Sequence, residues 1–281
     1  NLRSRINTGL EIPRDYKKSK EKIMSEKIEK EFDRDHREHT LVVEGRNAVL
    51  EAFRSGKPID KVFVLDGCQD GPIRTIIREA KKHDTIINFV NKDRLNQIST
   101  TGKHQGVIAY AAAYEYSEVE DMLKLAEEKG EDPFLILLDN IEDPHNLGAI
   151  IRTANLAGAH GVIIPKRRAV GLTATVAKTS AGALNYTPVA KVTNLAKTME
   201  ELKEKGLWFV CADMGGESMY RLNLKGPIGL VIGNEGEGVG RLVKEKCDFI
   251  ASIPMKGEID SLNASVAAGV LAYEIVRQRL N

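Results

Sequence analysis

Short apolar runs alternate with longer amphipathic stretches across residues 133–281, and this alternation leaves few folds open to the chain. The first run, 134–139, is apolar up to its last residue, which is typical of a strand buried on both faces. Similar runs follow at 161–165, 208–214, 229–233 and 249–255, and helical patterns lie at 147–157, 173–183, 194–206, 239–246 and 261–280. This alternation predicts an α/β fold with a mainly parallel sheet covered by helices.

Three polar or glycine-rich segments follow apolar strands of this region, at 139–146, 233–240 and 253–263. Each of them leads into a helical pattern. Ligands in parallel sheets bind beyond the carboxyl ends of the strands. We therefore expect the ligand site to be built from these three segments.

A smaller α/β unit precedes this region. Strand-like runs at 61–67, 85–90 and 106–112 alternate with helical patterns at 44–53, 72–84 and 92–99. Residues 114–132 then carry eight acidic side chains against two lysines, with a short helix indicated around Met122. The pattern predicts a small domain over 41–113, an acidic linker over 114–132 and a larger domain over 133–281.

The first forty residues resemble neither domain. They contain 11 Lys or Arg and 9 Asp or Glu, but few large apolar side chains. This composition predicts a tail over 1–40 that is disordered or at best a solvated helix. The chain begins without Met and Met24 heads a later run, so residues 1–23 are interpreted as a vector-derived or upstream-translated leader.

Charges nearly cancel over the whole chain, with 41 Lys or Arg against 40 Asp or Glu. Binding of nucleic acid by bulk attraction is therefore excluded, and RNA contacts would need local basic patches. Three scattered cysteines are too few for a disulfide framework or a zinc cluster, so no metal is expected. Short apolar runs and the absence of a secretory leader predict a cytoplasmic protein that does not enter the membrane.

Standard catalytic motifs fail on this sequence. A dinucleotide-binding loop is excluded because Arg241 stands where its third glycine is needed. A phosphate loop around Lys178 is excluded because Ala177 replaces the required glycine. The segment 233–240 remains as a glycine loop that permits close approach of the backbone to a ligand.

Three more specific motifs occur in order within the expected ligand segments. They are Asn146 through Arg152 to Gly158, then Gly233-Asn234-Glu235-Gly236-Glu237-Gly238, then Ile253-Pro254-Met255 with Ser261-Leu262-Asn263-Ala264-Ser265. In residue type and spacing they resemble the motifs of the SpoU branch of the SPOUT RNA methyltransferases, which methylate ribose 2′-hydroxyls. A chance match to all three motifs in order is far less expected than a chance match to a single glycine motif.

The smaller unit also resembles part of this family. Its start at 43–52 and its end at 104–107 are similar to the L30e-like substrate-binding domain of one subgroup, the enzymes that methylate a guanosine in the peptidyl-transferase P loop of 23S rRNA. The resemblance covers about 41–281. It implies a trefoil-knotted catalytic domain, S-adenosylmethionine as cofactor, and a homodimer whose active site draws on both subunits.

The resemblance points to Arg152 as the main catalytic residue. A guanidinium can hold an RNA phosphate and the ribose 2′-oxygen together, but it stays protonated in proteins. We therefore expect Arg152 to orient and activate the hydroxyl, with the proton passing to a substrate phosphate or to solvent. The matched positions Gly233, Ile253 and Leu262 are expected to meet the cofactor through their backbone.

Four polar residues complete the expected site. Asn146 is expected to cap the helix that carries Arg152, to act in the active site, or both. Glu235 is expected to order Asn146 or Arg152 by hydrogen bonding. Capping of the last helix explains Ser261, whereas Asn263 favours a role in the site.

Two short polar loops are the expected RNA contacts. They comprise Lys103, His104 and Gln105, and Lys166, Arg167 and Arg168. From its residues alone the first loop is either a tight turn or an RNA contact, with the turn favoured, whereas the family resemblance favours an RNA-facing loop. The second is a basic patch suited to phosphate contact, with a solvated loop as the alternative.

Two other functions fit parts of the sequence. The first is the same chemistry on a tRNA ribose or another rRNA nucleotide, although the smaller domain argues against tRNA enzymes, which usually lack it. The second is a non-catalytic RNA-binding protein, against which the complete set of polar site residues argues. Binding of S-adenosylmethionine separates enzyme from binder.

Overall fold

The computed structural model describes residues 41–259 and 261–280. The tail predicted over 1–40, with the leader inferred over 1–23, lies outside the described residues. Strands of the described part form two sheets, one within 41–111 and one within 134–252. No helix of this part is both long and apolar enough to cross a membrane.

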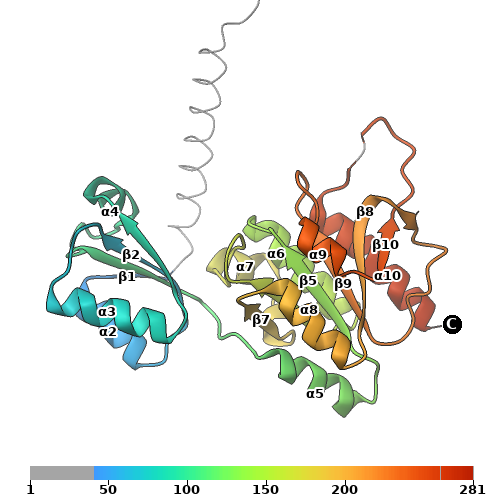
Figure 1. The fold of residues 1–281 in the computed structure, drawn as a ribbon, viewed down its shortest axis with the longest axis horizontal. Helices are drawn as coiled ribbons and strands as arrows, with labels where there is room; N and C mark the ends of the chain where they lie inside the picture. The colour runs from blue at the N-terminus through green and yellow to red at the C-terminus, as the bar shows by residue number, and fades with distance from the viewer. Residues whose placement is uncertain (1–40, 260, 281) are drawn as a thin grey trace, which may run out of the picture. The chain divides into compact units, whose positions relative to one another are not determined.

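The first sheet has four strands in the order β1-β4-β2-β3. Strand β4 pairs antiparallel with β1 and β2, while β2 and β3 are parallel. The elements are β1 (Leu41–Glu44), α2 (Arg46–Arg54), β2 (Ile59–Leu65), α3 (Gly71–Lys82), β3 (Ile86–Val90), α4 (Lys92–Ile98) and β4 (Val107–Ala111). Helices α2 and α3 cover one face of the sheet, and α4 covers the other (Figure 1).

Local residue chemistry explains where the helices of this unit begin. The Asp70 side chain accepts from the Ile73 N–H at the start of α3, and Asn91 accepts from Arg94 in the same way at α4. The predicted strands and helices are present, and the structure adds β1 at the edge of the sheet. Its four partly exposed residues are too few to show a periodic pattern.

The second sheet has six strands in the order β10-β8-β9-β5-β6-β7, and every neighbouring pair is parallel. Its elements are α5 (Val119–Lys129), β5 (Phe134–Asp139), α6 (Pro144–Leu156), β6 (Gly161–Pro165), α7 (Ala174–Thr179), η1 (Ala183–Asn185), β7 (Val189–Val192), α8 (Leu195–Glu204), β8 (Trp208–Ser218), β9 (Ile228–Gly233), α9 (Arg241–Glu245), β10 (Phe249–Ser252) and α10 (Ala264–Arg279). The predicted α/β fold with a mainly parallel sheet is confirmed, and the structure adds β7.

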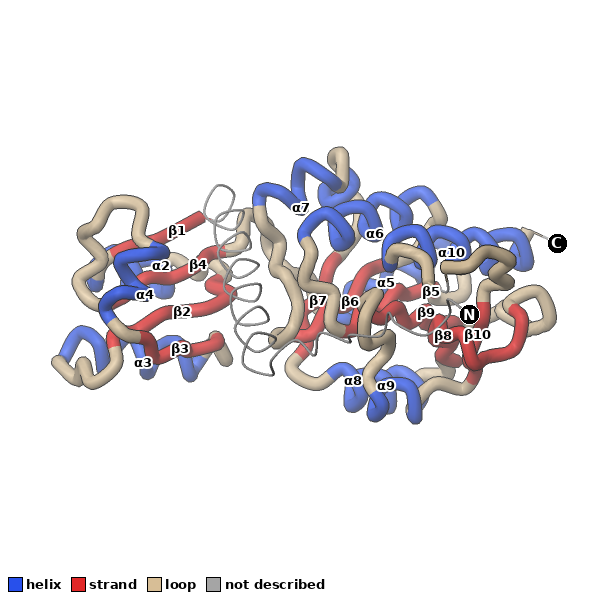
Figure 2. Tube along the Cα trace, turned by 90° about the horizontal axis from the view of Figure 1, so that it is seen from above, coloured by secondary structure: helices blue, strands red, loops and turns tan. Residues whose placement is uncertain are grey.

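Alternate residues of β5 feed two cores. Ile136 and Leu138 pack with residues of α6, α7 and α10, whereas Leu135 and Leu137 pack with residues of α5, α8 and α9. Figure 2 shows α6, α7 and α10 along one face of this sheet and α8 and α9 along the other. All six residues of β5 are buried, as expected for a central strand covered on both faces.

Much of the predicted linker forms α5. A reciprocal capping box between Glu118 and Asp121 starts the helix, and Met122 is buried against Gly161 of β6. A side chain at position 161 would collide with Met122, since an added Cβ would lie 2.2 Å from its sulfur. The acidic residues of the segment thus face outward, and its apolar side belongs to the second sheet's core.

The sheet order places the ends of β5 and β9 side by side. Asp139 pairs with Gly233, and each is the last residue of its strand. The chain runs from β5 outward to β7 on one side, then crosses to β8 on the other. This reversal creates the crevice beyond the strand ends in which ligands bind in such sheets.

Candidate active site

A hydrogen-bond network joins three of the predicted site residues. The Asn146 amide nitrogen donates to Glu235 Oε1 at 2.8 Å, and the Asn263 amide nitrogen donates to the same oxygen at 3.0 Å. Asn263 also donates to the Asn146 side-chain oxygen at 2.9 Å. The network connects α6, the loop after β9 and the start of α10, which come from three different parts of the chain.

Asn146 lies inside α6 and does not cap it. Asp143 is the cap, because its carboxylate accepts from the His145 N–H at 2.8 Å and Pro144 occupies the first turn. The predicted capping role of Asn146 is therefore wrong, since the Asp-Pro pair starts the helix earlier than expected. Asn146 is only 7% exposed, and its side chain makes the hydrogen bonds of the network.

The cap of α10 is Asn263 and not Ser261, which corrects the capping role predicted for Ser261. The Asn263 side-chain oxygen accepts from the N–H groups of Ser265 and Val266, whereas Ser261 lies outside the helix. An amide carries an acceptor at one end and donors at the other. Asn263 therefore caps α10 with its oxygen and joins the network with its nitrogen.

Three donors converge on Oε1 of Glu235, because the Ala264 N–H joins the two asparagine amides at 3.0 Å. Burial raises the pKa of this carboxyl, but the hydrogen bonds from Ala264, from its own N–H and from Asn146 outweigh burial, and the pKa lies below its ordinary value. An ionised carboxylate only accepts, so it fixes the orientation of both amides. The predicted ordering of Asn146 by Glu235 is confirmed.

The glycine loop after β9 is folded tightly on itself. Gly233 has no room for a side chain, since an added Cβ would lie 2.1 Å from the Gly238 carbonyl carbon. The Asn234 side-chain oxygen accepts from the N–H groups of Gly236 and Glu237 and holds the turn. The backbone of this loop is therefore closely packed at the end of the sheet.

Asp139 is a candidate residue that the sequence motifs did not single out. It ends β5, is 9% exposed, and accepts from the Gly240 N–H at 2.7 Å. This bond ties the far end of the glycine loop to the central strand. The available signal was a carboxylate at the end of an otherwise apolar run.

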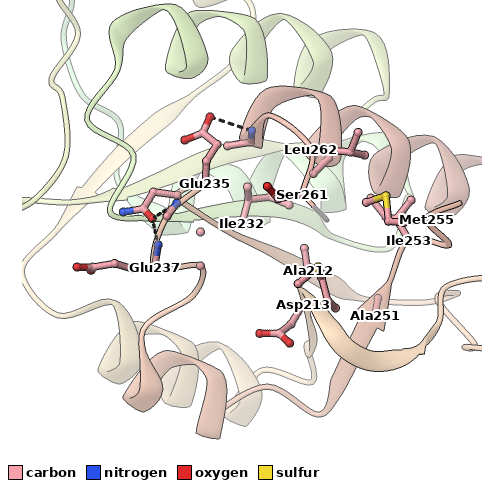
Figure 3. Close-up of a pocket in the computed structure, with 17 residues that line it drawn as sticks. Ala212, Asp213, Ile232, Glu235, Glu237, Ala251, Ile253, Met255, Ser261 and Leu262 are labelled. Atoms are coloured by element: carbon pink, nitrogen blue, oxygen red, sulfur yellow. Dashed lines mark hydrogen bonds between the residues drawn. The ribbon is translucent and has the colours of Figure 1, made fainter. Parts of the chain in front are cut away.

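A cavity of 270 Å³ opens beside the network, between β8, the glycine loop and the segment before α10. The predicted site residues that line it are Gly233, Glu235, Ile253, Ser261 and Leu262. Figure 3 shows Ile232 in the middle of these residues, with Glu235 on one side and Ile253 beside Met255 on the other. An apolar surface beside glycine backbone suits a ligand with a flat apolar part and polar edges.

Arg152 lies apart from the network. It is exposed on α6, six residues after Asn146, which places it about 9 Å further along the helix and about 120° around it. Within the described residues, no hydrogen bond or ion pair engages its guanidinium. The structure thus brings Asn146, Glu235 and Asn263 together and leaves Arg152 outside.

The predicted RNA loop before β4 has one exposed cation. His104 is 7% exposed, with one ring nitrogen 3.0 Å from the Asn96 side chain and the other accepting from the Gly106 N–H at 3.0 Å. Gln105 accepts two hydrogen bonds from the first residue of α2. Lys103 and Gln105 are both exposed, and Lys103 is the one of the two that carries a charge.

The second predicted RNA patch is divided. Lys166 is partly buried and pairs with Asp84 at 2.5 Å, whereas Arg167 and Arg168 are exposed. Arg168 lines a second cavity, which also contains Glu235 in its wall. Among the residues described, no group of three or more His, Cys, Asp or Glu could hold a metal ion.

Both sheets fall within known families. Residues 133–273 match the SpoU rRNA Methylase family, and residues 42–117 match the substrate-binding domain of RNA 2′-O ribose methyltransferases. The first match contains the whole network and the residues around the 270 Å³ cavity. The second match contains nearly all of the four-stranded sheet.

Full-length relatives and a solved structure agree with these matches. The chain is 53% identical over 244 residues to YacO of Bacillus subtilis (strain 168), a protein assigned to the TrmH family of tRNA/rRNA methyltransferases, with 86% of this chain and 97% of that one covered. A TrmH family relative from Staphylococcus saprophyticus is 47% identical over 242 residues, covering 85% and 96% of the two chains. The SpoU methyltransferase AviRb from Streptomyces viridochromogenes, crystallised with the cofactor AdoMet, is 26% identical with a TM-score of 0.54, covering 86% of this chain and 91% of its own. The chain therefore belongs to the SpoU family of RNA methyltransferases.

Proposed function

We propose that this protein transfers a methyl group from S-adenosylmethionine to the 2′-hydroxyl of a ribose in RNA. The observation that carries the proposal is the position of Glu235, which joins Asn146 to Asn263 and lines both an apolar cavity and a polar one. Such a wall lets a methyl donor and a nucleoside meet beside one rigid set of polar groups.

The 270 Å³ cavity fits S-adenosylmethionine. Its apolar residues, such as Ile253 and Leu262, suit the adenine ring. The missing side chain of Gly233 lets the loop after β9 fold back on the strand end and form the cavity wall. Asp213 and Glu235 both line the cavity, and their carboxylates suit the positive charges of the cofactor. When bound there, the cofactor supplies an activated methyl group.

The network acts by positioning groups rather than by taking up a proton. Glu235 has three donors on Oε1 and a lowered pKa, which make it a weak base at neutral pH. It holds the amides of Asn146 and Asn263 in fixed orientations, so the polar wall between the cavities stays rigid. The proton of the 2′-hydroxyl passes to a substrate phosphate or to solvent.

Arg152 holds the RNA phosphate and the 2′-oxygen and activates the hydroxyl by its charge. Because it lies outside the network of its own chain, it completes the site of a second copy in a homodimer. Helices α6 and α10 pack together and leave Leu156, Val266 and Tyr273 about half exposed or more. Exposed apolar side chains on neighbouring helices suit an interface between subunits.

The substrate within this proposal is 23S rRNA, with a guanosine of the peptidyl-transferase P loop as the target. The small domain over 41–113 binds the RNA, with Lys103 as an exposed cation for phosphate contact, and the linker over 114–132 joins it to the catalytic domain over 133–281. Arg167 supplies a further exposed cation on the catalytic side. The proposal includes the trefoil knot of the family and a cytoplasmic location, where ribosomal RNA is found.

The test begins with calorimetric titration of the protein with S-adenosylmethionine. Absence of detectable heat would refute the enzyme and favour the non-catalytic RNA-binding protein. Unmodified 23S rRNA transcript and bulk unmodified tRNA are then incubated separately with labelled cofactor, and the RNA is digested to nucleosides. A labelled 2′-O-methylnucleoside from the 23S transcript supports the proposal, whereas label in tRNA alone would identify the tRNA alternative.

A further inference from the structure

A buried ion pair joins the two sheets of the molecule. Asp60 of β2 pairs with Lys191 of β7, and their side chains are only 9% and 12% exposed. The Lys191 ammonium also lies over the ring of Tyr116, 5.0 Å from the ring centroid. Tyr116 belongs to the segment between the sheets, so one buried contact holds the first sheet, the second sheet and the connecting chain together.

The Tyr116 hydroxyl bridges the two sides of this contact. It donates to Asp60 Oδ1 at 2.9 Å and accepts from the Leu172 N–H at 3.0 Å. Burial raises the pKa of Tyr116 well above its ordinary value, and the charge of Asp60 raises the pKa further. The hydroxyl therefore stays protonated and can donate to one side while it accepts from the other.

The loop after β6 approaches this contact too closely for a side chain at Gly171. An added Cβ would lie 2.2 Å from Asp60 Oδ2 and 2.9 Å from the Tyr116 hydroxyl. The next residue, Leu172, also accepts from the Ala113 N–H through its carbonyl at 2.8 Å. The loop after β6 is therefore fitted to the unit of the first sheet and to the segment that follows it.

A second ion pair repeats the arrangement nearer the surface. Asp84, between α3 and β3, accepts from Lys166 at 2.5 Å and from the Thr193 hydroxyl at 2.8 Å. The hydrogen bond from Lys166 lowers the pKa of Asp84, so the carboxylate stays charged. In both pairs the carboxylate comes from the unit of the first sheet and the ammonium from the unit of the second.

A buried ion pair is a poor source of stability but a good constraint on geometry. Taking two charges out of water costs about as much free energy as their attraction returns, and apolar side chains of similar size often stabilise a protein as well. Separating the partners within the protein is strongly unfavourable, because each then remains as an uncompensated charge. The Asp60–Lys191 pair thus favours one relative position of the two sheets.

The loop that receives the first unit also borders the candidate active site. Its Val170 N–H donates to the carbonyl of Ile141, in the segment between β5 and α6, at 3.0 Å. Arg168 of the same loop lines the cavity that Glu235 also lines. Residues 166–172 therefore contact the unit of the first sheet on one side and the surroundings of the site on the other.

We propose that the two ion pairs and Tyr116 are positioning residues, which hold the RNA-binding domain in one place on the catalytic domain and so present bound RNA to the active site in one orientation. The inference rests on the proposed function. A domain on a free linker raises only the local concentration of the RNA, whereas a fixed domain also sets its orientation. These residues act through the domain that they hold and not on the reacting atoms.

The first arm of the test measures whether the contact holds the domains. The variant D60N/K191M removes both charges, so neither is left buried without a partner. Hydrogen exchange of the full chain, followed by mass spectrometry, should become faster in the peptides that contain Ala113 and Leu172 and stay unchanged in β5. Asp66→Asn, an exposed change just after β2, is the matched control and should keep wild-type exchange.

The second arm measures the effect on the RNA reaction, with unmodified 23S rRNA transcript and labelled S-adenosylmethionine. In D60N/K191M the KM for the transcript should rise roughly tenfold, because the RNA is no longer presented in one orientation. Its kcat and its affinity for the cofactor should stay within about twofold, since the site itself is intact. Gly171→Ala leaves every charge in place but puts a methyl group where Asp60 lies, so it should raise the KM in the same way.

Calorimetric titration with S-adenosylmethionine shows which variants are folded, and Gly171→Ala decides the question if D60N/K191M fails to bind the cofactor. Unchanged exchange in a folded variant would overturn the proposal, because the contact would not hold the domains. Faster exchange with a wild-type KM would overturn it as well, because the position of the domain would not matter to the reaction. Absence of transfer to any RNA by wild type would instead overturn the proposed function, and this inference with it.

Discussion

Two carboxylates organise two loops of this chain in opposite ways. Glu44, at the end of β1, accepts hydrogen bonds from three consecutive residues, 99–101, through both of its oxygens. Glu235 accepts from α6 and from the start of α10 through Oε1 alone. No other described residue donates to its second oxygen.

This difference separates a structural carboxylate from one that can organise a site. Burial raises the pKa of Glu44, but hydrogen bonds from residues 99–101 outweigh it and lower the pKa to about 2. Its acceptor capacity is used up within one loop. Glu235 instead joins distant elements and keeps one oxygen beside two cavities, which is what a group at a meeting point of two substrates requires.

Methyl transfer at the site that Glu235 organises should depend most strongly on Arg152. Arg152→Ala should lower methyl transfer by roughly a thousandfold, because the charge that activates the 2′-hydroxyl is lost. Affinity for S-adenosylmethionine should stay within about twofold, since Arg152 does not line the cofactor cavity. Label transfer and calorimetry measure the two quantities. Arg54→Ala, an exposed change at the end of α2, is the control, and near-normal turnover of the Arg152 variant would remove Arg152 from the mechanism.

Glu235→Gln should lower turnover by roughly a hundredfold. The neutral amide keeps the size of the side chain but no longer holds both asparagine amides by its charge, so the polar wall loses its fixed orientation. Thermal unfolding should change little by comparison with turnover. A variant with turnover within threefold of wild type would place Glu235 with Glu44 as a purely structural carboxylate.

Variants of Asp139 test whether the loop that carries Glu235 needs the hydrogen bond that ties it to β5. Asp139→Ala should weaken S-adenosylmethionine binding by roughly tenfold, because the hydrogen bond from the Gly240 N–H is lost. Asp139→Asn should restore most of the affinity, since its side-chain oxygen still accepts. Calorimetry on both variants gives the comparison, and wild-type affinity in the alanine variant would show that the anchor is dispensable.

Glu44 should affect stability and leave cofactor affinity unchanged. Its pKa falls from 4.5 to about 2 on folding, so its contribution is complete above pH 4.5 and is lost as the pH falls toward 2. Because Glu44 is partly exposed and solvent screens its interactions, Glu44→Gln should destabilise the first sheet by about 2 kcal/mol at pH 7, less than the full pKa change would give. Urea unfolding, followed by hydrogen exchange within 41–111, measures this difference. It should shrink as the pH drops below 4.5, and a difference that is constant with pH would contradict the assignment.

Local sequence patterns predict most of the helices and strands, and the elements and caps that they miss have local causes. An apolar run such as 134–139 predicts a buried strand, because a strand covered on both faces of a parallel sheet has apolar side chains on both sides. Strands β1 and β7 were missed because each is a four-residue segment that contains a charged side chain, so neither forms an apolar run. The caps of α6 and α10 were misassigned because several capping residues stand close together at both helix starts.

The site was predictable as a set of segments and less so as a set of contacts. The family motifs named Asn146, Glu235 and Asn263, and the structure joins all three. His104 illustrates the opposite case. Its polarity suggested an RNA contact, but burial against Asn96 gives it a structural role that no local pattern reveals.

The order and spacing of residues alone establish the α/β architecture, the three ligand segments and the family to which their motifs belong. The contact of Glu235 with Asn146, 89 residues away, and the position of Arg152 outside this contact are seen only in the folded chain. Both depend on the pairing of distant strands and on helix rotation. The register that sets Asp139 opposite Gly233 brings the segments together, and the turn of α6 directs each side chain to a different side.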